Sequence, residues 1–389
     1  MTGSWRKVKV LGIMMTVNFF IYIVVEVSRS GSHEKDLNHR VRIPDKLFWK
    51  KIVALDAYWN REQQRLDLLH NPILAVLNGS NSSLKDGMDN SSHLNSCDPD
   101  IGVMTHVKDY NSLPERFKDF LLFMKCRTYP MVVNQPHKCK DKPFLLLAVK
   151  SLAPHFDRRQ AIRESWGKTG QLENFTVATV FLLGNATAED HFPDLSEMLQ
   201  YESRMHGDLL IWDYRDSFFN LTIKEVLFLE WVSQYCSEVK FVFKGDDDVF
   251  VNTYEQKAKD LFIGDVIMNA GPHRDKKLKY FIPESMFVGP YPPYAGGGGF
   301  LYSGSLALRL YNISQQVSLY PIDDVYTGMC LKKLGLVPEK HKGFKTFDIE
   351  DKYRNNPCAY KSLMLVHSRT PQEMIKIWTW LKDPELNCH

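Results

Sequence analysis

The chain has 389 residues, 24% of them charged, and a formal net charge of +3. A charge so close to neutral argues against a nucleic-acid-binding or polybasic membrane-surface protein. The length is enough for one large domain or two ordinary ones. None of the seven cysteines forms a Cys-x-x-Cys pair, which argues against a zinc site, and their odd number leaves at least one thiol free or intermolecular.

The N-terminus has the pattern of a membrane anchor. Residues 10–25 carry no charge and follow a short tail with basic and no acidic residues. The positive-inside rule predicts a signal anchor over residues 10–27, a cytosolic tail over 1–9 and a lumenal chain beyond the anchor. The short apolar run suits the thinner bilayers of the early secretory pathway. The alternative is a cleaved signal peptide, for which residues 28–30 form a poor cleavage motif.

Seven Asn-x-Ser/Thr sequons predict N-glycosylation and agree with a lumenal chain. They stand at Asn78, Asn81, Asn90, Asn174, Asn185, Asn220 and Asn312. The cysteines would lie in the same oxidising compartment and can form disulfides, but their pairing cannot be deduced from the sequence.

Three regions follow the predicted anchor. Residues 28–95 are polar and indicate a stem, although Phe48, Trp49, Tyr58 and Trp59 predict some ordered contact there. Residues 96–141 form a segment that contains three cysteines. Residues 142–389 alternate short apolar runs with helical patterns, which predicts an α/β catalytic domain.

The expected elements of this α/β region are short. Strands are predicted at 143–149, 177–183, 209–213, 240–243 and 261–267. Helices are predicted at 158–166, 195–205 and 223–235, with an earlier amphipathic helix at 114–124. Because ligands of open α/β sheets bind beyond the carboxyl ends of the strands, residues at those ends are the first candidates for a site.

The strongest candidate is the acidic triplet Asp246, Asp247 and Asp248, which directly follows an apolar strand. Three adjacent carboxylates at a strand end repel one another unless a cation or ligand neutralises them. Mg²⁺ and Mn²⁺ prefer such oxygen ligands and commonly bind a substrate diphosphate as well. The triplet therefore predicts a metal-dependent enzyme that acts on a nucleotide-linked substrate.

Basic residues near the first predicted strand are candidates for a phosphate site. Lys150 and Ser151 follow that strand, and Arg159 and Arg163 share one face of the next helix. Two arginines at this spacing can form a clamp for a diphosphate. They are equally compatible with an ordinary surface face of a helix.

Residues 294–300 contain four consecutive glycines between aromatic residues. Glycine allows a ligand to approach the main chain closely, and aromatic rings stack on the apolar faces of sugars. The segment therefore predicts a sugar-binding floor that includes Tyr294, Gly296, Gly297 and Gly298. The alternative is a flexible loop; no Walker lysine follows the glycines.

Two further acidic residues and a histidine complete the candidates. Asp323 and Asp324 begin a predicted helix, where one Asp suffices as a cap and the second can serve as a general base. His367 ends an apolar strand over 363–367 and is either an exposed side chain or a metal ligand.

Taken together, these motifs resemble the β1,3-glycosyltransferases of the Golgi along the whole chain. The matching segments are RRxxIRxSWG at 158–167, FLLG at 181–184, KGDDDV at 244–249, YAGGGGF at 294–300 and DDVYTG at 323–328. The resemblance implies a GT-A (Rossmann-like) fold with a mixed central sheet and a reaction that inverts the anomeric centre.

The resemblance also implies residue roles. Asp324 would be the catalytic base, and Asp246, Asp248 and His367 would bind the metal. The donor would be bound by Lys150, Ser151, Arg159, Arg163, Lys244, Asp246 and Asp247. The acceptor side would comprise Tyr294, Gly296, Gly297, Gly298 and Asp323.

The implied reaction is the transfer of N-acetylglucosamine from UDP-GlcNAc to the 3-hydroxyl of terminal galactose in N-acetyllactosamine, with Mn²⁺ or Mg²⁺. It would extend poly-N-acetyllactosamine on glycoproteins. The implied setting is the Golgi membrane, alone or in an oligomer with itself or other Golgi glycosyltransferases. A β1,3-galactosyltransferase that uses UDP-Gal is the alternative within the family, because donor choice depends on a few pocket contacts. A non-catalytic carbohydrate-binding protein and a metal-dependent phosphohydrolase are the alternatives outside it.

One segment departs from the family pattern. The connection at 252–259 is about ten residues shorter than the family leads us to expect, and a parallel crossover usually needs a dozen or more residues. The sequence therefore leaves open a catalytically impaired variant.

Overall fold

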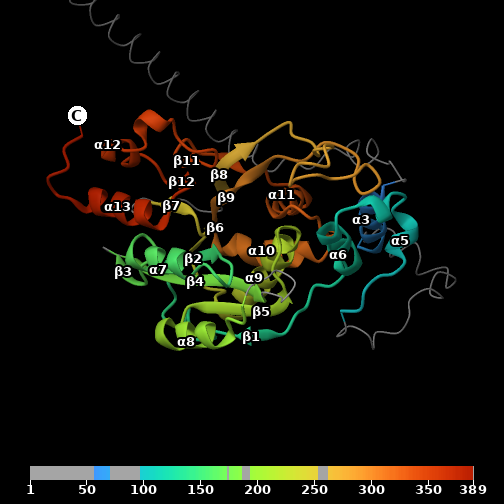
Figure 1. The fold of residues 1–389 in the computed structure, drawn as a ribbon, viewed down its shortest axis with the longest axis horizontal. Coiled ribbons are helices and arrows are strands. Elements are labelled where there is room, and N and C mark those ends of the chain that lie inside the picture. The colour runs from blue at the N-terminus through green and yellow to red at the C-terminus, as the bar shows by residue number, and fades with distance from the viewer. Residues whose placement is uncertain (1–56, 71–96, 173–174, 186–192, 253–261, 389) are drawn as a thin grey trace, which may run out of the picture. The chain divides into compact units, whose positions relative to one another are not determined.

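The computed structural model describes residues 57–70, 97–172, 175–185, 193–252 and 262–388 (Figure 1). All of them belong to one structural unit. No helix within these residues is both long and apolar enough to cross a bilayer. The predicted anchor at 10–27 and most of the short connection, from residue 253 onward, lie outside the described residues.

A nine-stranded mixed sheet forms the centre of the fold, in the order β1-β5-β4-β2-β6-β9-β8-β10, with β3 paired to β4. Its strands are β1 (Met131–Val133), β2 (Leu145–Lys150), β3 (Gly170–Leu172), β4 (Phe175–Asn185), β5 (Leu209–Arg215), β6 (Phe241–Asp246), β8 (Phe262–Ile267), β9 (Tyr294–Ser303) and β10 (Glu339–Lys340). The four strands β5, β4, β2 and β6 are parallel, and β9 runs antiparallel to both β6 and β8. The predicted mixed α/β sheet is confirmed.

The order of the parallel strands positions the site. The chain passes from β2 to β4 and β5 in one direction and then returns to place β6 on the other side of β2. This reversal leaves a crevice between neighbouring strand ends, where ligands of such sheets bind. The carboxyl ends of β2 and β6 carry Lys150 and Asp246, which face each other in the strand register.

Helices cover both faces of the sheet. One face packs against α7 (Phe156–Glu164), α8 (Ser196–His206) and α13 (Pro371–Lys382), and the other against α9 (Leu221–Tyr235), α10 (Gly304–Ser314) and α11 (Asp323–Lys333). Successive residues of β2 alternate between the two cores: Leu146 and Ala148 belong to one, Leu145 and Leu147 to the other. A strand buried on both faces reads as a continuous apolar run, which is why the sequence predicts it well.

A smaller three-stranded sheet lies beside the acidic triplet. It contains β7 (Val249–Val251), β11 (Phe344–Lys345) and β12 (Leu365–His367) in the order β11-β12-β7. Because β12 runs antiparallel to β7, His367 pairs with Val249, the residue that follows the triplet. A residue more than a hundred positions away is thereby brought to the strand end.

Further helices and turns complete the described fold. They are α3 (Tyr58–Leu69), α5 (Val103–His106), α6 (Glu115–Phe123), α12 (Pro357–Tyr360) and the 3₁₀ turns at Tyr110–Ser112, Phe218–Asn220 and Asp351–Tyr353. Helix α3 comes from the predicted stem yet is anchored to the body of the protein. Trp59 is buried and its indole N–H donates to Ser318 O at 3.0 Å, while the Tyr58 N–H donates to Ser285 O at 2.8 Å. The ordered contact predicted for these two residues is present.

Six cysteines form three disulfides, Cys97–Cys126, Cys139–Cys236 and Cys358–Cys388. Cys330 is the remaining thiol and is buried in α11. The prediction of at least one unpaired cysteine is confirmed.

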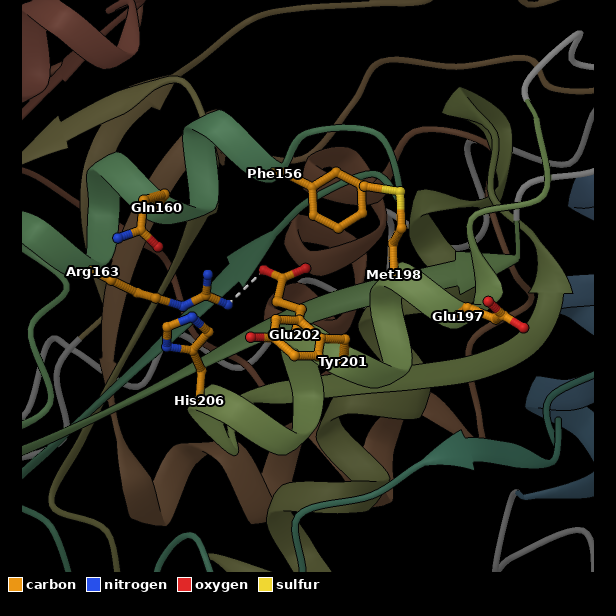
Figure 2. Close-up of a pocket in the computed structure, with 8 residues that line it drawn as sticks. All are labelled: Phe156, Gln160, Arg163, Glu197, Met198, Tyr201, Glu202 and His206. Atoms are coloured by element: carbon orange, nitrogen blue, oxygen red, sulfur yellow. Dashed lines mark hydrogen bonds and ion pairs between the residues drawn. The ribbon is translucent and has the colours of Figure 1, made fainter.

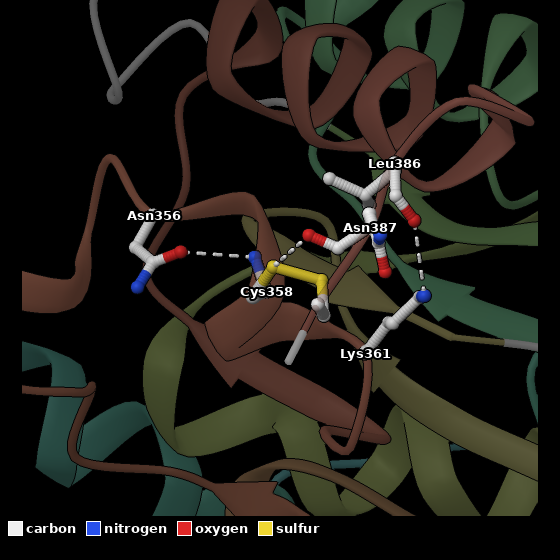
Figure 3. Close-up of a disulfide and its surroundings, with 6 residues drawn as sticks. Asn356, Cys358, Lys361, Leu386 and Asn387 are labelled. Atoms are coloured by element: carbon white, nitrogen blue, oxygen red, sulfur yellow. Dashed lines mark hydrogen bonds between the residues drawn. A yellow bond between two sulfur atoms is a disulfide. The ribbon is translucent and has the colours of Figure 1, made fainter.

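The last disulfide ties the C-terminal segment to helix α12 (Figure 3). Two hydrogen bonds flank it: Cys358 N donates to Asn356 Oδ1 at 3.0 Å, and Lys361 Nζ donates to Leu386 O at 3.3 Å. The segment that follows α13 is therefore held against α12 by a covalent bond and by polar contacts.

The described sequons differ in exposure. Asn312 is exposed on α10, whereas the Asn185 side chain is half-buried and donates to Asp213 Oδ1 at 2.6 Å. Asn220 is buried and its Nδ2 donates to Arg215 O at 2.8 Å, so a glycan there requires this amide to turn outward. The remaining predicted sites lie outside the described residues: Asn78, Asn81, Asn90 and Asn174.

Candidate functional site

The acidic triplet and His367 form a cluster that can hold a cation. One ligand atom each from Asp246, Asp248 and His367 lies within 4.8 Å of the other two. Asp246 is the last residue of β6, and Asp248 precedes β7. All three side chains are half-buried, so they are shielded from bulk water but open to a ligand. Two carboxylates and one imidazole are a donor set that fits a divalent metal.

The imidazole of His367 is oriented by its second nitrogen. Nδ1 lies 3.1 Å from Thr346 O, so it can donate to that carbonyl and leave the lone pair of Nε2 turned towards Asp248, whose Oδ1 is 3.4 Å away. Such a backbone contact is the usual way in which proteins fix a metal-binding histidine. The pKa of His367 is raised, chiefly by the hydrogen bond between its ring and the side chain of Asp248.

The middle residue of the triplet points to different partners. Asp247 is buried and accepts from Ser151 Oγ at 2.7 Å, from His155 Nδ1 at 2.8 Å and from Arg158 Nη1 at 2.8 Å. Burial alone would raise the pKa of Asp247, but these hydrogen bonds outweigh it and lower the pKa. Asp247 therefore anchors the triplet to the end of β2 and to α7.

Arg158 lies on the helix considered for a phosphate site but was not among the predicted donor-binding residues, and His155 was missed altogether. The guanidinium of Arg158 also lies 3.7 Å from Asp248 Oδ2, and its side chain remains 33% exposed. It is thus an accessible cation directly beside the candidate metal ligands. Its position on the helix that follows the first strand could have identified it. Arg159 and Arg163 lie on the same helix, however, so the sequence could not distinguish the three.

Lys150 joins two acidic groups beneath the cluster. Its Nζ lies 2.8 Å from Asp246 Oδ1, 2.9 Å from Asp323 Oδ2 and 3.3 Å from Gly297 O. The ammonium is buried, and a buried charge needs such partners. Lys150 therefore faces the inside of the site, where it holds β6 against the start of α11.

Lys244 is also directed inward. It is buried, forms an ion pair with Glu225 of α9 and lies 3.6 Å from Asp323 Oδ2. Burial lowers the pKa of Lys244 to about 7, although the charge of Asp323 opposes that shift. The structure thus places Lys244 behind Asp323 and away from the open side of the cluster.

The two acidic residues at the start of α11 occupy different environments. Burial would raise the pKa of Asp323, but the charges of Lys150 and Lys244 hold it below its ordinary value. For Asp324, burial and then the charge of Asp323 raise the pKa to about 7. Two neighbouring carboxyls whose pKa values are pushed apart mark candidate acid and base roles. Asp324 is the one suited to exchange a proton near neutral pH.

The glycine-rich segment is a strand, so the alternative interpretation of it as a flexible loop is wrong. Gly296 to Gly299 lie in β9, against the loop that contains Thr346, helix α11 and β12. A Cβ at Gly298 would lie 3.3 Å from His367 Cβ, and one at Gly297 would lie 3.5 Å from Asp324 Oδ2. Gly299 has a φ of +156° and a Cβ there would lie 2.6 Å from Leu365 Cδ1. The glycines let the site's supporting elements approach closely.

Tyr294 begins β9 and is half-buried beside Tyr291, with ring centroids 6.2 Å apart at 78°. Burial first, and then the charge of Asp324, raise the pKa of Tyr294. This aromatic side chain therefore lies near the candidate base, and its place on the acceptor side stays a prediction.

The predicted diphosphate clamp of Arg159 and Arg163 is occupied by protein carboxylates. Arg159 is fully buried and binds both oxygens of Glu202 at 2.8 Å, while Arg163 binds Glu202 at 2.7 Å and Asp208 at 2.8 and 2.9 Å. Within the described residues, Arg159 reaches the acidic cluster through Ser151, to whose Oγ its Nη1 donates at 3.1 Å. The acidic partners, one in α8 and one directly before β5, are distant in sequence, so the pattern of α7 could not reveal them.

Arg163 and Glu202 also border a groove of about 440 Å³ between α7 and α8 (Figure 2). Its other lining residues are Phe156, Gln160, Glu197, Met198, Tyr201 and His206. None of the three candidate metal ligands lines this groove, so it is separate from the acidic cluster.

Comparisons with known proteins identify the family of this chain. The galactosyltransferase family model matches residues 157–342. N-acetyllactosaminide β-1,3-N-acetylglucosaminyltransferase 2 of Homo sapiens is 61% identical over 399 positions, covering 100% of both chains, and its Mus musculus counterpart is also 61% identical over 100% of both. UDP-GlcNAc:βGal β-1,3-N-acetylglucosaminyltransferase 7 of Rattus norvegicus is 44% identical, covering 73% of this chain and 76% of its own.

The human alignment has 399 positions against 389 residues here, so the human protein has residues that this chain lacks. The alignment nevertheless covers the full chain, which includes the region that carries the acidic cluster. The chain belongs to the galactosyltransferase family, together with these β-1,3-N-acetylglucosaminyltransferases.

Proposed function

We propose that this protein transfers N-acetylglucosamine from UDP-GlcNAc to the 3-hydroxyl of a terminal galactose in N-acetyllactosamine, with inversion. The names of its relatives state this sugar and this linkage. The observation that carries the proposal is the pairing of a cation-binding cluster with a carboxyl whose pKa is raised to about 7. A glycosyl transfer from a nucleotide sugar requires both a stabilised leaving group and a proton acceptor.

In this proposal Asp246, Asp248 and His367 hold the divalent metal. A cation bound there would stabilise the negative charge that develops on the departing UDP. Mn²⁺ suits the set better than Mg²⁺, because Mg²⁺ prefers an all-oxygen shell and His367 contributes nitrogen. Thr346 and Asp247 keep these ligands in place through the hydrogen bonds described above.

The donor's diphosphate would lie on the open side of the cluster. Arg158 is the accessible cation there, and its planar guanidinium suits phosphate oxygens. Lys150, Ser151 and Lys244 would act from behind, by holding the carboxylates that face the donor. This assignment moves the phosphate contact from Arg159 and Arg163 to their neighbour.

Asp324 would accept the proton of the attacking hydroxyl. Its Oδ1 accepts the Val325 N–H at 2.8 Å, which orients the carboxyl at the start of α11. Gly297 leaves space beside Oδ2, and Tyr294 provides an aromatic surface for the acceptor sugar. One base and one stabilised leaving group suffice for inversion, because no covalent sugar–enzyme intermediate is needed.

The proposed setting is the Golgi membrane, with the N-terminal anchor at 10–27 and the catalytic region in the lumen. The disulfides support an oxidising compartment. The acceptor would then be a galactose-terminated glycan on a glycoprotein, and assembly with itself or other Golgi glycosyltransferases stays a prediction.

A donor and acceptor panel tests the proposal. The full-length protein, purified in detergent, is incubated with UDP-GlcNAc or UDP-Gal, N-acetyllactosamine and Mn²⁺, and the product linkage is determined by NMR. We expect a β1,3-linked N-acetylglucosamine. The galactosyltransferase match favours one second candidate, so β1,3-linked galactose would assign that activity instead. Phosphate release without transfer, or sugar binding without turnover, would contradict both.

A further inference from the structure

The two candidate metal ligands outside β6 are supported by one short segment behind them. Asp248 precedes β7 and His367 ends β12. Two residues after His367, the Arg369 N–H donates to Asp248 O at 2.6 Å, which extends the pairing of β7 and β12 up to the acidic triplet. The main chain of Asp248 is thus fixed by Arg369.

The side chain of Arg369 is itself deeply anchored. It is 2% exposed, and its Nη2 lies 2.8 Å from Asp348 Oδ1 and 3.1 Å from Tyr360 OH. Its Nη1 donates to Ser368 O at 2.6 Å. Asp348 provides the charge that a buried guanidinium requires.

Asp348 belongs to the loop that orients His367. That loop also contains Thr346, whose carbonyl lies 3.1 Å from His367 Nδ1. Asp348 has a φ of +72°, and its Oδ1 accepts the Ile349 N–H at 2.6 Å. The position of the Thr346 carbonyl therefore depends on the same short loop that Arg369 holds through Asp348.

These contacts form a closed ring. Thr346 supports His367, Arg369 supports Asp248, and the Asp348–Arg369 ion pair joins the two supports. The ring closes where His367 Nε2 lies 3.4 Å from Asp248 Oδ1. A change in the ion pair would release both ligands at once, although neither of its members touches the cation position.

We propose that Asp348 and Arg369 are positioning residues that set the separation of Asp248 and His367 and thereby the affinity for the divalent cation. The inference rests on the proposed function, because it assigns a cation to this cluster. Asp246 is held separately by Lys150, so loss of the pair loosens two ligands of three. Loss of residues that orient metal ligands typically weakens metal binding 10- to 100-fold, and we expect roughly that range here.

The network offers a matched control. Arg354 binds both oxygens of Glu373, at 2.7 and 3.1 Å, and also contacts Asp348 Oδ2 at 2.8 Å. Glu373 also forms the capping box of α13 with Thr370. Glu373→Gln therefore perturbs the same half-buried network and the fold's stability without touching the Asp348–Arg369 pair or the two supports.

The experiment compares Asp348→Asn, Arg369→Lys and Glu373→Gln with the unmodified full-length protein. Binding of Mn²⁺ in the presence of UDP is measured by calorimetry without turnover, and transfer is measured over a range of Mn²⁺ concentrations. We expect the first two variants to bind Mn²⁺ roughly 10- to 100-fold more weakly, with kcat recovered at saturating Mn²⁺. Glu373→Gln should lower the melting temperature and leave Mn²⁺ affinity unchanged.

The outcomes separate two failures. If the unmodified protein binds no Mn²⁺ with UDP, the proposed metal-dependent function is wrong. If it binds Mn²⁺ and Asp348→Asn binds equally well, or if Glu373→Gln weakens binding as much, the positioning role is wrong. Should Arg369→Lys fail to fold, the nearly isosteric Asp348→Asn decides the question alone.

Discussion

Two clusters of charged residues in this protein are both predicted from the sequence to bind a ligand, but the structure shows that their charges are balanced differently. In the arginine cluster between α7 and α8, two cations, Arg159 and Arg163, are paired with two carboxylates, Glu202 and Asp208. In the acidic cluster at the strand ends, five carboxylates have fewer cationic side chains beside them than their own number. Those carboxylates are Asp246, Asp247, Asp248, Asp323 and Asp324.

The difference teaches how to distinguish a structural cluster from a functional one. Charges that are balanced and hydrogen-bonded within the protein need no ligand, so the arginine cluster can be complete as it stands. The acidic cluster has Lys150, Lys244 and Arg158 as cationic partners, and Lys244 is also paired with Glu225, so a net negative charge remains at a half-buried site. Such an excess favours a bound cation. The comparison can be tested by changing one member of either cluster.

The largest effect is expected from Asp324→Asn. The amide retains the shape of the carboxyl but cannot accept the proton, so the transfer rate should fall by a factor of roughly 10² to 10⁴. Binding of UDP with Mn²⁺, measured by calorimetry, should stay close to that of the unmodified protein. Near-normal turnover of the variant would remove Asp324 from the catalytic role.

The same substitution should not weaken the fold. The pKa of Asp324 is raised to about 7 from an ordinary value of 3.8, so the folded state binds this proton more tightly than the unfolded state. Asp324 therefore costs stability increasingly as pH rises from about 4 to about 7. In metal-free buffer at pH 8, Asp324→Asn should melt at a higher temperature than the unmodified protein.

Glu202→Gln, in the arginine cluster, is expected to lower the stability of the fold and not the activity. Removing this charge leaves the buried Arg159 without its carboxylate partner and the partly exposed Arg163 with Asp208 alone, and breaking a buried pair costs about 3–5 kcal/mol. Denaturant unfolding should show this loss, while the Mn²⁺ affinity of the folded fraction should not change. A large drop in Mn²⁺ affinity would mean that the two clusters are not independent.

Asp248→Ala tests the acidic cluster from the opposite direction. It removes a proposed ligand, so Mn²⁺-dependent binding of UDP should weaken by more than the roughly 10- to 100-fold expected for a residue that only orients a ligand. A chelator should stop transfer by the unmodified protein, and added Mn²⁺ should restore it. Full transfer in excess chelator would show that the cluster needs no metal.

The smallest expected effect is the pH dependence of transfer. A base with a pKa of about 7 is ionised above that pH, so kcat should fall up to about tenfold for each pH unit below it. A bound cation would lower the pKa of Asp324, because positive charge favours the ionised carboxyl. The fall in kcat would then begin at a lower pH. A rate that is constant between pH 5 and 8 would contradict the assignment of Asp324.

The elements that the sequence predicted best are those with local causes. The apolar runs of β2, β4 and β6 are buried on both faces, so their composition alone indicates strands. The acidic triplet is recognisable because its charges are adjacent. The helix that begins at Asp323 is recognisable because acidic residues stabilise the first turn.

The parts that could not be predicted depend on contacts between distant residues. Arg159 and Glu202 are 43 positions apart, so their pairing cannot be read from a helix-face pattern. The glycines of β9 suggested a loop because glycine is costly in a strand, and only the approach of β12 and α11 explains them. Arg158 differs from Arg159 only in the direction in which α7 presents it.

Cys330 has a consequence for how the protein acquires its disulfides. Burial raises the pKa of this thiol to about 12, so almost none of it is thiolate at neutral pH. Thiol–disulfide exchange proceeds through the thiolate, and the folded protein therefore contains no internal nucleophile that can attack its three bridges. Once formed, the covalent pattern is protected against rearrangement for as long as α11 stays packed. An alkylating reagent should accordingly modify Cys330 only after unfolding, and scrambled bridges should arise only then.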